Sequence, residues 1–345
     1  MQQTGRRKGV SLREIANAVG VTEGTASRAL NGYPDIAQAT RLKVAEAARV
    51  LNYRPSPSAR RLACGTVETV GYVLPAHSAG QTDPFLSEML DGISQALAVR
   101  DWDLLVTTVA TPEHELDVYE RLVDSGKVSG LIVTRTRSED RRVDFLKSAG
   151  LPFVVHGRTR DATGYAWLDI DNEKAFADAV GHLAALGHRR IALISASPEF
   201  NFSRLRIDGY TNGLAQSGLP APAGYIVEAD LSAEGGRQAM AALLAHKQRP
   251  TAVICVSDSV AIGAMQAIRS HGLKVGHDIS VIGYDGLPFG AYSDPPLTTM
   301  TQDVNRTGRR LAEMLLAILD GAAAEEFQEI WHVRLVRRVS DSSPR

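Results

Sequence analysis

The chain has 345 residues, of which 44% are hydrophobic and 22% are charged, and its formal net charge is −1. This composition is typical of globular proteins, and the length allows two or three domains. No apolar run approaches the ~20 residues that a membrane helix needs, and no apolar signal segment follows the basic N-terminus. Cys64 and Cys255 are the only cysteines and have no metal-binding spacing. We therefore expect a cytoplasmic protein without a membrane segment, metal site or cofactor.

The charge is unevenly distributed along the chain. Residues 1–65 hold 11 Lys and Arg against 4 Asp and Glu, a net of +7, whereas the remainder holds 27 against 35, a net of −8. A basic end attached to an acidic body indicates a nucleic-acid-binding module joined to a second functional unit.

The N-terminal segment predicts a helix-turn-helix. Apolar residues follow the spacing of one helix face at Leu12, Ile15, Ala16 and Val19. Ser11 and Glu14 have the capping-box spacing, and Gly20 can adopt the positive φ that ends a helix. Thr22 is expected to cap a second helix over 23–30, and a third helix is expected over about 38–51. In such a motif the second helix enters the DNA major groove.

Two further motifs resemble a known family. The segment 25–32, TASRALNG, resembles the recognition helix of the LacI/GalR family of bacterial transcription regulators. The segments 52–55, NYRP, and 59–62, ARRL, resemble the hinge of that family. The resemblance implies a headpiece over 1–54, a hinge over 55–65 and an effector-binding core over 66–345. It implies a repressor of a palindromic double-stranded DNA operator, controlled by a small molecule. A C-terminus without leucine heptads favours a homodimer over a tetramer.

The resemblance assigns roles in the headpiece. Glu23, Gly24 and Arg28 lie at base-reading positions. Arg28 can pair with guanine through two hydrogen bonds, a contact worth roughly 1–3 kcal/mol of discrimination. Glu23 can accept from cytosine, or it can only stabilise the positive end of its helix. Small donors suited to phosphate oxygens are expected at Thr22, Thr25, Ser27 and Asn31.

The predicted hinge helix, over about 56–64, is too short to be stable alone, because helices under ~12 residues are marginal in water. The resemblance implies that it folds when DNA and the partner subunit hold it, with Ala59 and Arg60 at the DNA. It also implies that Leu62 wedges into the minor groove. The alternative is that Leu62 packs against the body.

From residue 66 onward, apolar strand-like runs alternate with helical stretches, which favours parallel sheets covered on both faces. The body resembles the type I periplasmic-binding-protein fold, with two doubly wound, Rossmann-like lobes. We expect the first lobe to comprise about 66–165 and 295–325. The second lobe is expected to comprise about 166–294 and 326–340.

A ligand is expected in the cleft between the lobes, beyond the carboxyl ends of the strands. Arg206 corresponds to the arginine that clamps the effector in the family, and Asp285 to an acidic cleft residue. The remaining candidates follow other predicted strands: Asp83, Phe85, His156, Arg158, Phe200, Asp230, Ser257 and Asp258. Asp258 has the alternative role of capping the next helix. Carboxylates, arginines and aromatic faces suit a mono- or disaccharide, and a nucleobase is the alternative.

Two other classes of protein compete with a regulator. An enzyme is disfavoured because the chain has no GxxxxGK[ST] loop, no GxSxG elbow and no GxGxxG after its first strand. A solute-binding protein would share the body fold but would carry a signal peptide and no headpiece. The sequence leaves open an activator, or a regulator that responds to another metabolite.

Overall fold

The computed structural model describes residues 10–30, 32–53, 67–74 and 83–345. The chain forms two compact units, a headpiece over 1–67 and a body over 68–345. Each unit is considered separately below. Within the described ranges, no helix is long and apolar enough to cross a membrane.

The headpiece contains the three expected helices, α1 (Leu12–Val19), α2 (Glu23–Leu30) and α3 (Gln38–Val50). Both hydrogen bonds of the capping box between Ser11 and Glu14 are present, and Gly20 ends α1 at φ 75°. Their shared core is small and consists of Ile15, Ala16, Ala26, Ala29 and Val44. The helix-turn-helix prediction is therefore confirmed, from its caps to its buried face.

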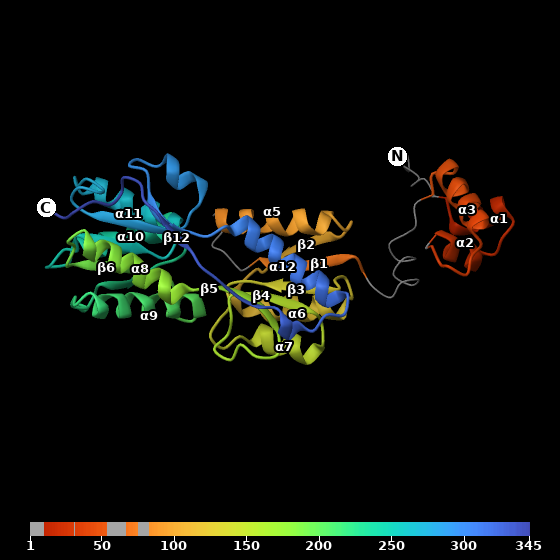
Figure 1. The fold of residues 1–345 in the computed structure, drawn as a ribbon, viewed down its shortest axis with the longest axis horizontal. Helices are drawn as coiled ribbons and strands as arrows, with labels where there is room; N and C mark the ends of the chain where they lie inside the picture. The colour runs from red at the N-terminus through yellow and green to blue at the C-terminus, as the bar shows by residue number, and fades with distance from the viewer. Residues whose placement is uncertain (1–9, 31, 54–66, 75–82) are drawn as a thin grey trace, which may run out of the picture. The chain divides into compact units, whose positions relative to one another are not determined.

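The body contains two six-stranded sheets, which occupy two lobes (Figure 1). The first sheet has the order β11-β5-β4-β3-β1-β2, and all of its neighbouring strands are parallel. Its strands are β1 (Thr69–Leu74), β2 (Asp103–Thr108), β3 (Gly130–Val133), β4 (Phe153–His156), β5 (Ala166–Ile170) and β11 (Gln328–Trp331).

The second sheet has the order β12-β10-β9-β8-β6-β7. Only the β12–β10 pair is antiparallel among its neighbours. Its strands are β6 (Ile191–Ser195), β7 (Ile226–Glu228), β8 (Ala252–Cys255), β9 (Ser280–Asp285), β10 (Thr298–Thr301) and β12 (Arg334–Val336).

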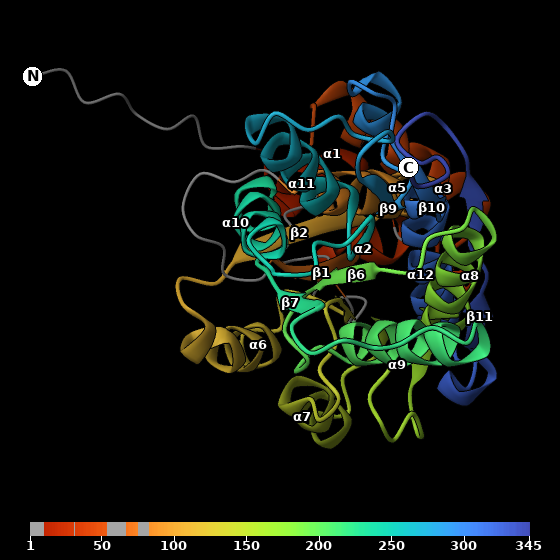
Figure 2. The ribbon, with the colours of Figure 1, turned by 90° about the vertical axis from the view of Figure 1, so that its left-hand side faces the viewer.

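Helices cover both faces of each sheet, as expected for doubly wound lobes. The first lobe carries α5 (Pro84–Ala98), α6 (Glu115–Asp124), α7 (Arg141–Ala149) and α12 (Val304–Leu319). The second carries α8 (Asn172–Ala185), α9 (Asn201–Gln216), α10 (Ala233–Leu244) and α11 (Asp258–Ser270). Figure 2 shows α8 and α9 on the opposite side of the second sheet from α10 and α11. Three short 3-10 turns, η1 (Pro112–His114), η2 (Pro288–Tyr292) and η3 (Ala324–Glu326), complete the described elements.

Close helix packing in the first lobe depends on two glycines. A Cβ atom on Gly92 of α5 would lie 1.9 Å from the carbonyl oxygen of Asn305, and one on Gly308 of α12 would lie 2.2 Å from that of Met89. These glycines let the backbones of α5 and α12 touch, which fixes α12 within the first lobe.

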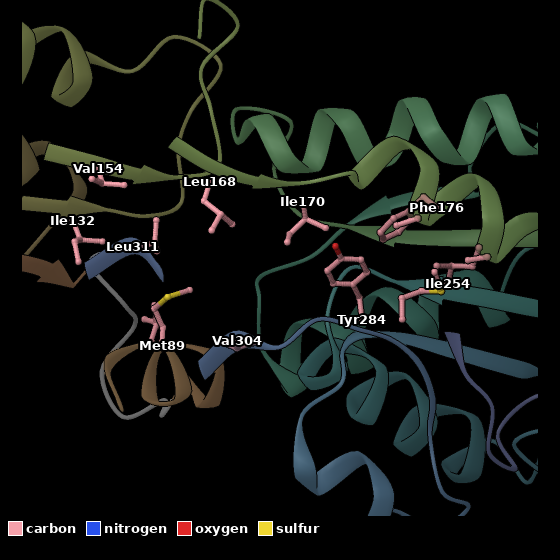
Figure 3. Packing of buried hydrophobic residues seen from close by; sticks show 14 of the residues in the cluster. Met89, Ile132, Val154, Leu168, Ile170, Phe176, Ile254, Tyr284, Val304 and Leu311 are labelled. Atoms are coloured by element: carbon pink, nitrogen blue, oxygen red, sulfur yellow. The ribbon is translucent and has the colours of Figure 1, made fainter. Parts of the chain in front are cut away.

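One apolar core runs through both lobes. Met89, Val154 and Leu168 of the first lobe belong to the same buried cluster as Phe176 and Tyr284 of the second. Figure 3 shows Ile170 between these two groups, where the chain passes from one lobe to the other. The base of the cleft is therefore packed apolar structure.

The strand pairing corrects the expected lobe boundaries by one strand at each crossing. The chain passes between lobes after β5, after β10 and after β11, near residues 171, 302–303 and 332–333. The expected boundaries had put β5 in the second lobe, β10 in the first and β11 in the second. They were wrong because each strand completes its ladder before the chain crosses; β5, for example, lies fully buried between β4 and β11.

Candidate DNA-binding and effector sites

The recognition helix α2 presents its predicted DNA-contacting residues on its outer side. The Thr22 hydroxyl accepts from the Thr25 amide at 3.1 Å, which confirms the predicted cap, and the two hydroxyls lie 2.9 Å apart. Glu23 and Gly24 are exposed, whereas Ala26 and Ala29 are buried against the other helices. The exposed face is therefore polar and small, which suits close approach to a groove.

Arg28, the predicted guanine reader, is already engaged within the headpiece. Its guanidinium forms an ion pair with Asp35 and lies 5.4 Å from the centre of the Tyr33 ring. All of these groups are partly exposed to solvent, so DNA could compete for Arg28. Ala37 lies at the N-cap of α3 and forms no side-chain hydrogen bond there.

Four predicted DNA contacts lie outside the described residues: Asn31, Ala59, Arg60 and Leu62. The predicted hinge helix over 56–64 lies outside them as well. Their roles remain predictions.

In the body, a cavity lies between the two lobes; about 770 Å³ there is not filled by protein atoms, and part of this space is open to solvent. The residues that line it come from the ends of β3, β4 and β5 on one side and from α9, α11 and β9 on the other. Seven predicted effector residues line it: Asp83, Phe85, His156, Arg158, Arg206, Ser257 and Asp285. The cleft between the lobes therefore holds the largest part of the predicted site.

Arg206 is held rigidly at the side of the cavity. Its Nε donates to Asn172 Oδ1 at 2.8 Å, and its Nη1 donates to the carbonyl oxygen of Val256 at 2.6 Å. The guanidinium carbon lies 3.7 Å from the centre of the Tyr284 ring and 4.8 Å from that of Phe202. Aromatic faces attract cations, so these rings hold the charge in place and leave little rotational freedom.

Asp285 approaches the same cavity from a strained backbone. Its φ is 106°, a region that L-residues rarely adopt, and Gly286 follows with φ 78°. Burial raises the pKa of its carboxyl well above the usual value, although the charge of Arg206 opposes this effect. Gln302 donates to Asp285 Oδ1 at 2.8 Å, while Gln302 Oε1 is buried without a hydrogen-bond partner. Strain of this kind persists where the surrounding structure holds it and is frequent at ligand sites.

His156 is a neutral group near the positive charge of Arg206. Desolvation and the positive charge of Arg206 lower its pKa to about 4, so it carries no charge at neutral pH. Its ring lies 5.8 Å from that of Phe85, and its Nε2 is buried without a hydrogen-bond partner.

Two ion pairs complete the polar lining on the first-lobe side. Arg158 Nε lies 3.1 Å from Asp169 Oδ2, and Arg135 pairs with Asp83, whose carboxylate also caps α5. Burial raises the pKa of Asp169 to about 6, against the opposing charge of Arg158. The arginines of the cavity are therefore already neutralised or hydrogen-bonded by the protein itself.

Three predicted effector residues do not line the cavity. Asp258 is buried behind it, where its carboxylate accepts from the Leu287 amide at 2.7 Å and the Thr299 hydroxyl at 2.6 Å. It fastens the second lobe internally, and Ser257 rather than Asp258 caps α11. Asp230 is exposed because β7 is an edge strand, and Leu231 lines the cavity instead. Phe200 forms a β-bridge with Arg137 and stacks on Phe202, which takes the lining position.

Sequence reasoning missed several lining residues that now appear: Arg135, Thr136, Asp169, Ile170, Asn172, Phe202, Leu231, Val256, Ser259, Leu287 and Gln302. Asp169 and Asn172 were missed because β5 was not predicted as a strand. Arg135 lies two residues after β3, and Gln302 lies directly after β10. Both could have been found by the rule that ligand-binding residues follow the carboxyl ends of strands.

No group of three or more His, Cys, Asp or Glu side chains within the described ranges could hold a metal ion. The charged groups of the cavity instead lie in pairs, Arg135 with Asp83 and Arg158 with Asp169.

Comparison with known proteins supports both halves of this description. Residues 11–56 match the family model of bacterial regulatory proteins of the lacI family, and residues 180–340 match that of the periplasmic binding protein-like domain. The HTH-type transcriptional regulator AglR of Rhizobium meliloti (strain 1021) is 36% identical over 96% of this chain and 94% of its own length. The HTH-type transcriptional repressor CytR of Escherichia coli (strain K12) is 30% identical over 96% of each chain.

Solved structures agree with these relatives. The lac repressor dimer bound to operator and the anti-inducer ONPF is 29% identical, with a TM-score of 0.84, over 97% of this chain and 100% of that one. The transcriptional regulator CelR in complex with cellobiose is 27% identical, with a TM-score of 0.73, over 96% of this chain and 99% of that one. The chain belongs to the LacI family of DNA-binding transcriptional regulators.

Proposed function

We propose that this regulator is a repressor that binds a palindromic operator as a homodimer and is controlled by an uncharged mono- or disaccharide bound between the lobes. The operator half of the proposal follows from geometry. The eight-residue helix α2 spans few base pairs, so sequence-specific binding needs two copies of it on a two-fold symmetric site. Relatives that are named repressors, such as CytR, support repression over activation.

The observation that carries the effector half is a set of unsatisfied polar atoms in the cavity. His156 Nε2 and Gln302 Oε1 are buried without a hydrogen-bond partner, and Asp169 Oδ2 faces Arg158 at 3.1 Å without hydrogen-bond geometry. Buried polar atoms are usually hydrogen-bonded, so a ligand with several hydroxyls would supply the hydrogen bonds that these atoms lack. Phe85 and Phe202 offer apolar faces for the C–H side of a sugar ring.

The charge of the cavity favours an uncharged ligand. Arg135 and Arg158 lie against Asp83 and Asp169, and Arg206 is hydrogen-bonded to protein oxygens. A phosphate or carboxylate on the ligand would have to compete with these carboxylates. A neutral saccharide can use both partners of each pair, since its hydroxyls donate and accept.

The test is a screen of the full-length protein. A labelled palindromic DNA is first identified by selection from a random pool. Its complex is then exposed to neutral sugars, uronates, sugar phosphates and nucleobases. We expect release of DNA by a neutral saccharide and direct binding of it in calorimetry. Binding only of an anionic sugar or a nucleobase would overturn the effector assignment, and tighter DNA binding in its presence would overturn the proposed induction.

A further inference from the structure

The two lobes touch a second time, away from the three crossings. Residues 136–138, which follow β3 in the first lobe, pair with residues 199–201, which precede α9 in the second, around an antiparallel bridge between Arg137 and Phe200. The Ser138 amide donates to the Glu199 carbonyl at 3.1 Å, and the Asn201 amide donates to the Thr136 carbonyl at 2.9 Å. Thr136 and Asn201 also line the effector cavity, so this pairing, here called the interlobe bridge, lies at its edge.

The first-lobe half of the interlobe bridge rests on a buried cluster of charges. Arg142 donates to Asp140 through Nε at 2.9 Å and through Nη2 at 2.6 Å, and to Glu115 through Nη1 at 2.8 Å. The side chains of Arg142 and Asp140 are only 5% and 0% exposed. Burial alone would raise the pKa of Asp140, but hydrogen bonds and charge from Arg142 outweigh it and lower that pKa.

This cluster holds the loop that carries the bridge at three points. Arg142 Nη2 donates to the carbonyl oxygen of Arg135 at 3.1 Å. Asp140 Oδ2 accepts from the Arg137 amide at 2.9 Å, and Glu115 Oε2 accepts from Arg137 Nη1 at 2.8 Å. Each hydrogen bond acts on the residues directly before or at the bridge. A buried ion pair adds little to the free energy of unfolding, because the cost of removing both charges from water offsets their attraction. The main effect of this cluster is therefore to fix the position of the loop.

The second-lobe half leads to the effector clamp. Phe200 stacks on Phe202 with ring centres 5.4 Å apart, and Arg206 lies 4.8 Å from the centre of the Phe202 ring. Ser138 Oγ adds a contact to Asn201 Oδ1 at 3.3 Å. The bridge therefore connects the charge cluster of the first lobe to the residues that hold Arg206 in the second.

We infer that Arg142 is a positioning residue that presents residues 136–138 to the second lobe, so that the interlobe bridge holds the two lobes together at the edge of the cleft. Effector entry and exit then require the two bridging hydrogen bonds to break, a consequence that rests on the proposed function. The bridge itself does not depend on what the effector is. Its test accordingly uses neither ligand nor DNA.

The bridge predicts a specific cross-link. Because hydrogen bonds flank the Arg137–Phe200 pair and do not join it, the pair is of the non-hydrogen-bonded kind, with Cα atoms about 4.5 Å apart. That spacing falls within the range of natural disulfides. In full-length protein with Cys64→Ser, the double variant Arg137→Cys/Phe200→Cys should form an intramolecular disulfide in air. The matched variant Ser138→Cys/Phe200→Cys should not, because neighbouring strand residues face opposite sides.

The positioning role is tested by fluorescence energy transfer between dyes on Asp124→Cys and Gln216→Cys, one on each lobe, with amide exchange measured at Ser138 and Asn201. Arg142→Met should widen the distance distribution and lower the protection of both amides at least tenfold. Arg141→Met, at the exposed neighbouring position, should change neither.

Unchanged protection in a folded Arg142→Met protein would overturn the role of Arg142. If that variant does not fold, the cross-link decides. The bridge is overturned if no disulfide forms between positions 137 and 200 in the first double variant, or if both double variants cross-link equally.

Discussion

The ion pairs of the headpiece differ from the buried ion pairs of the body. In the headpiece, the described ion pairs Arg13–Glu23, Arg28–Asp35 and Arg49–Glu46 are about half exposed or more, with side-chain exposures of 48–77%. In the body, the pairs Arg142–Asp140 and Arg135–Asp83 are at most 15% exposed. Exposed pairs contribute little to stability and exchange partners easily, whereas buried pairs are fixed by their surroundings. The arginines of the headpiece can therefore exchange their partners for phosphates and bases. The buried pairs of the body instead hold the loops beside the cavity in one position.

The largest effect is expected from removing the charge of Arg206 at the side of the cavity. Arg206→Ala removes the donor to Asn172 and the positive charge near Asp285, and loss of a buried, hydrogen-bonded charge at a binding site costs about 2–5 kcal/mol of binding free energy. Affinity for the sugar identified by screening should fall at least a hundredfold in calorimetry. Arg204→Ala, which removes a half-exposed pair with Asp208 on the same helix, serves as the control. Equal affinity in the Arg206 variant would remove that residue from the site.

A second test concerns Asp258, a buried carboxyl of the body that accepts hydrogen bonds from a hydroxyl and a backbone amide. Burial raises its pKa from 3.8 to about 6 in the folded protein, so the folded state holds the proton more tightly than the unfolded state. The contribution of Asp258 to stability is therefore greatest below pH 3.8 and is lost as the pH rises through about 6, a loss of roughly 3 kcal/mol.

Asp258→Asn removes this titration and keeps the shape of the side chain. The amide can still accept from Leu287 and donate to Thr299. The difference in free energy of unfolding between variant and parent, measured with urea at pH 4 and pH 7, should shift in favour of the variant at pH 7. Comparing the two proteins cancels the opposite contributions of Asp140 and Asp341, whose pKa values are lowered. A pH-independent difference would contradict the elevated pKa.

In the headpiece, Arg28→Ala should weaken operator binding by about ten- to a hundredfold, the equivalent of roughly 1–3 kcal/mol. The loss should be largest for sites with guanine at the contacted position. Fluorescence anisotropy at constant salt measures it, because phosphate contacts depend strongly on salt. Arg49→Ala removes an exposed arginine of α3 as the control. A uniform loss across all sequences would show that Arg28 contacts phosphate only.

The smallest effects concern the helix caps. Ser11→Ala removes a cap that is hydrogen-bonded in the structure, and Ala37→Ser supplies a hydroxyl where α3 has none. The first should cost about 1 kcal/mol and the second should gain somewhat less. Amide exchange in α1 and α3 of the full-length protein reports both. The two changes in stability need not be equal in size. A gain in stability from Ser11→Ala would contradict the capping assignment.

Local sequence patterns were sufficient for the headpiece. The ends of α1 and α2 were predicted to the residue, because Ser11, Gly20 and Thr22 act on backbone groups within a few positions of themselves. The alternation of strands and helices in the body was predicted for the same reason. Arg206 and Asp285 were found because each lies in a short motif that resembles the family.

The rest of the site depends on which strands lie side by side, and that is decided by pairing between distant segments. β5 was missed because its five residues include the charged Asp169 and do not alternate between apolar and polar side chains; its burial between β4 and β11 defines it. With β5 missing, Asp169 and Asn172 were missing from the site, and the first lobe crossing was placed one strand too early; β10 and β11 displaced the other two crossings in the same way.

The amino-acid sequence by itself determined the helix-turn-helix, the class of the body and the family, because caps, periodicity and motifs act over a few residues. Only the tertiary structure decided that Asp258 lies behind the cavity, that Arg135 pairs with Asp83 within it, and that residues 136–138 meet residues 199–201 across the lobes. These contacts join segments tens of residues apart. Whether two such segments meet depends on the packing of both sheets, which no local pattern encodes.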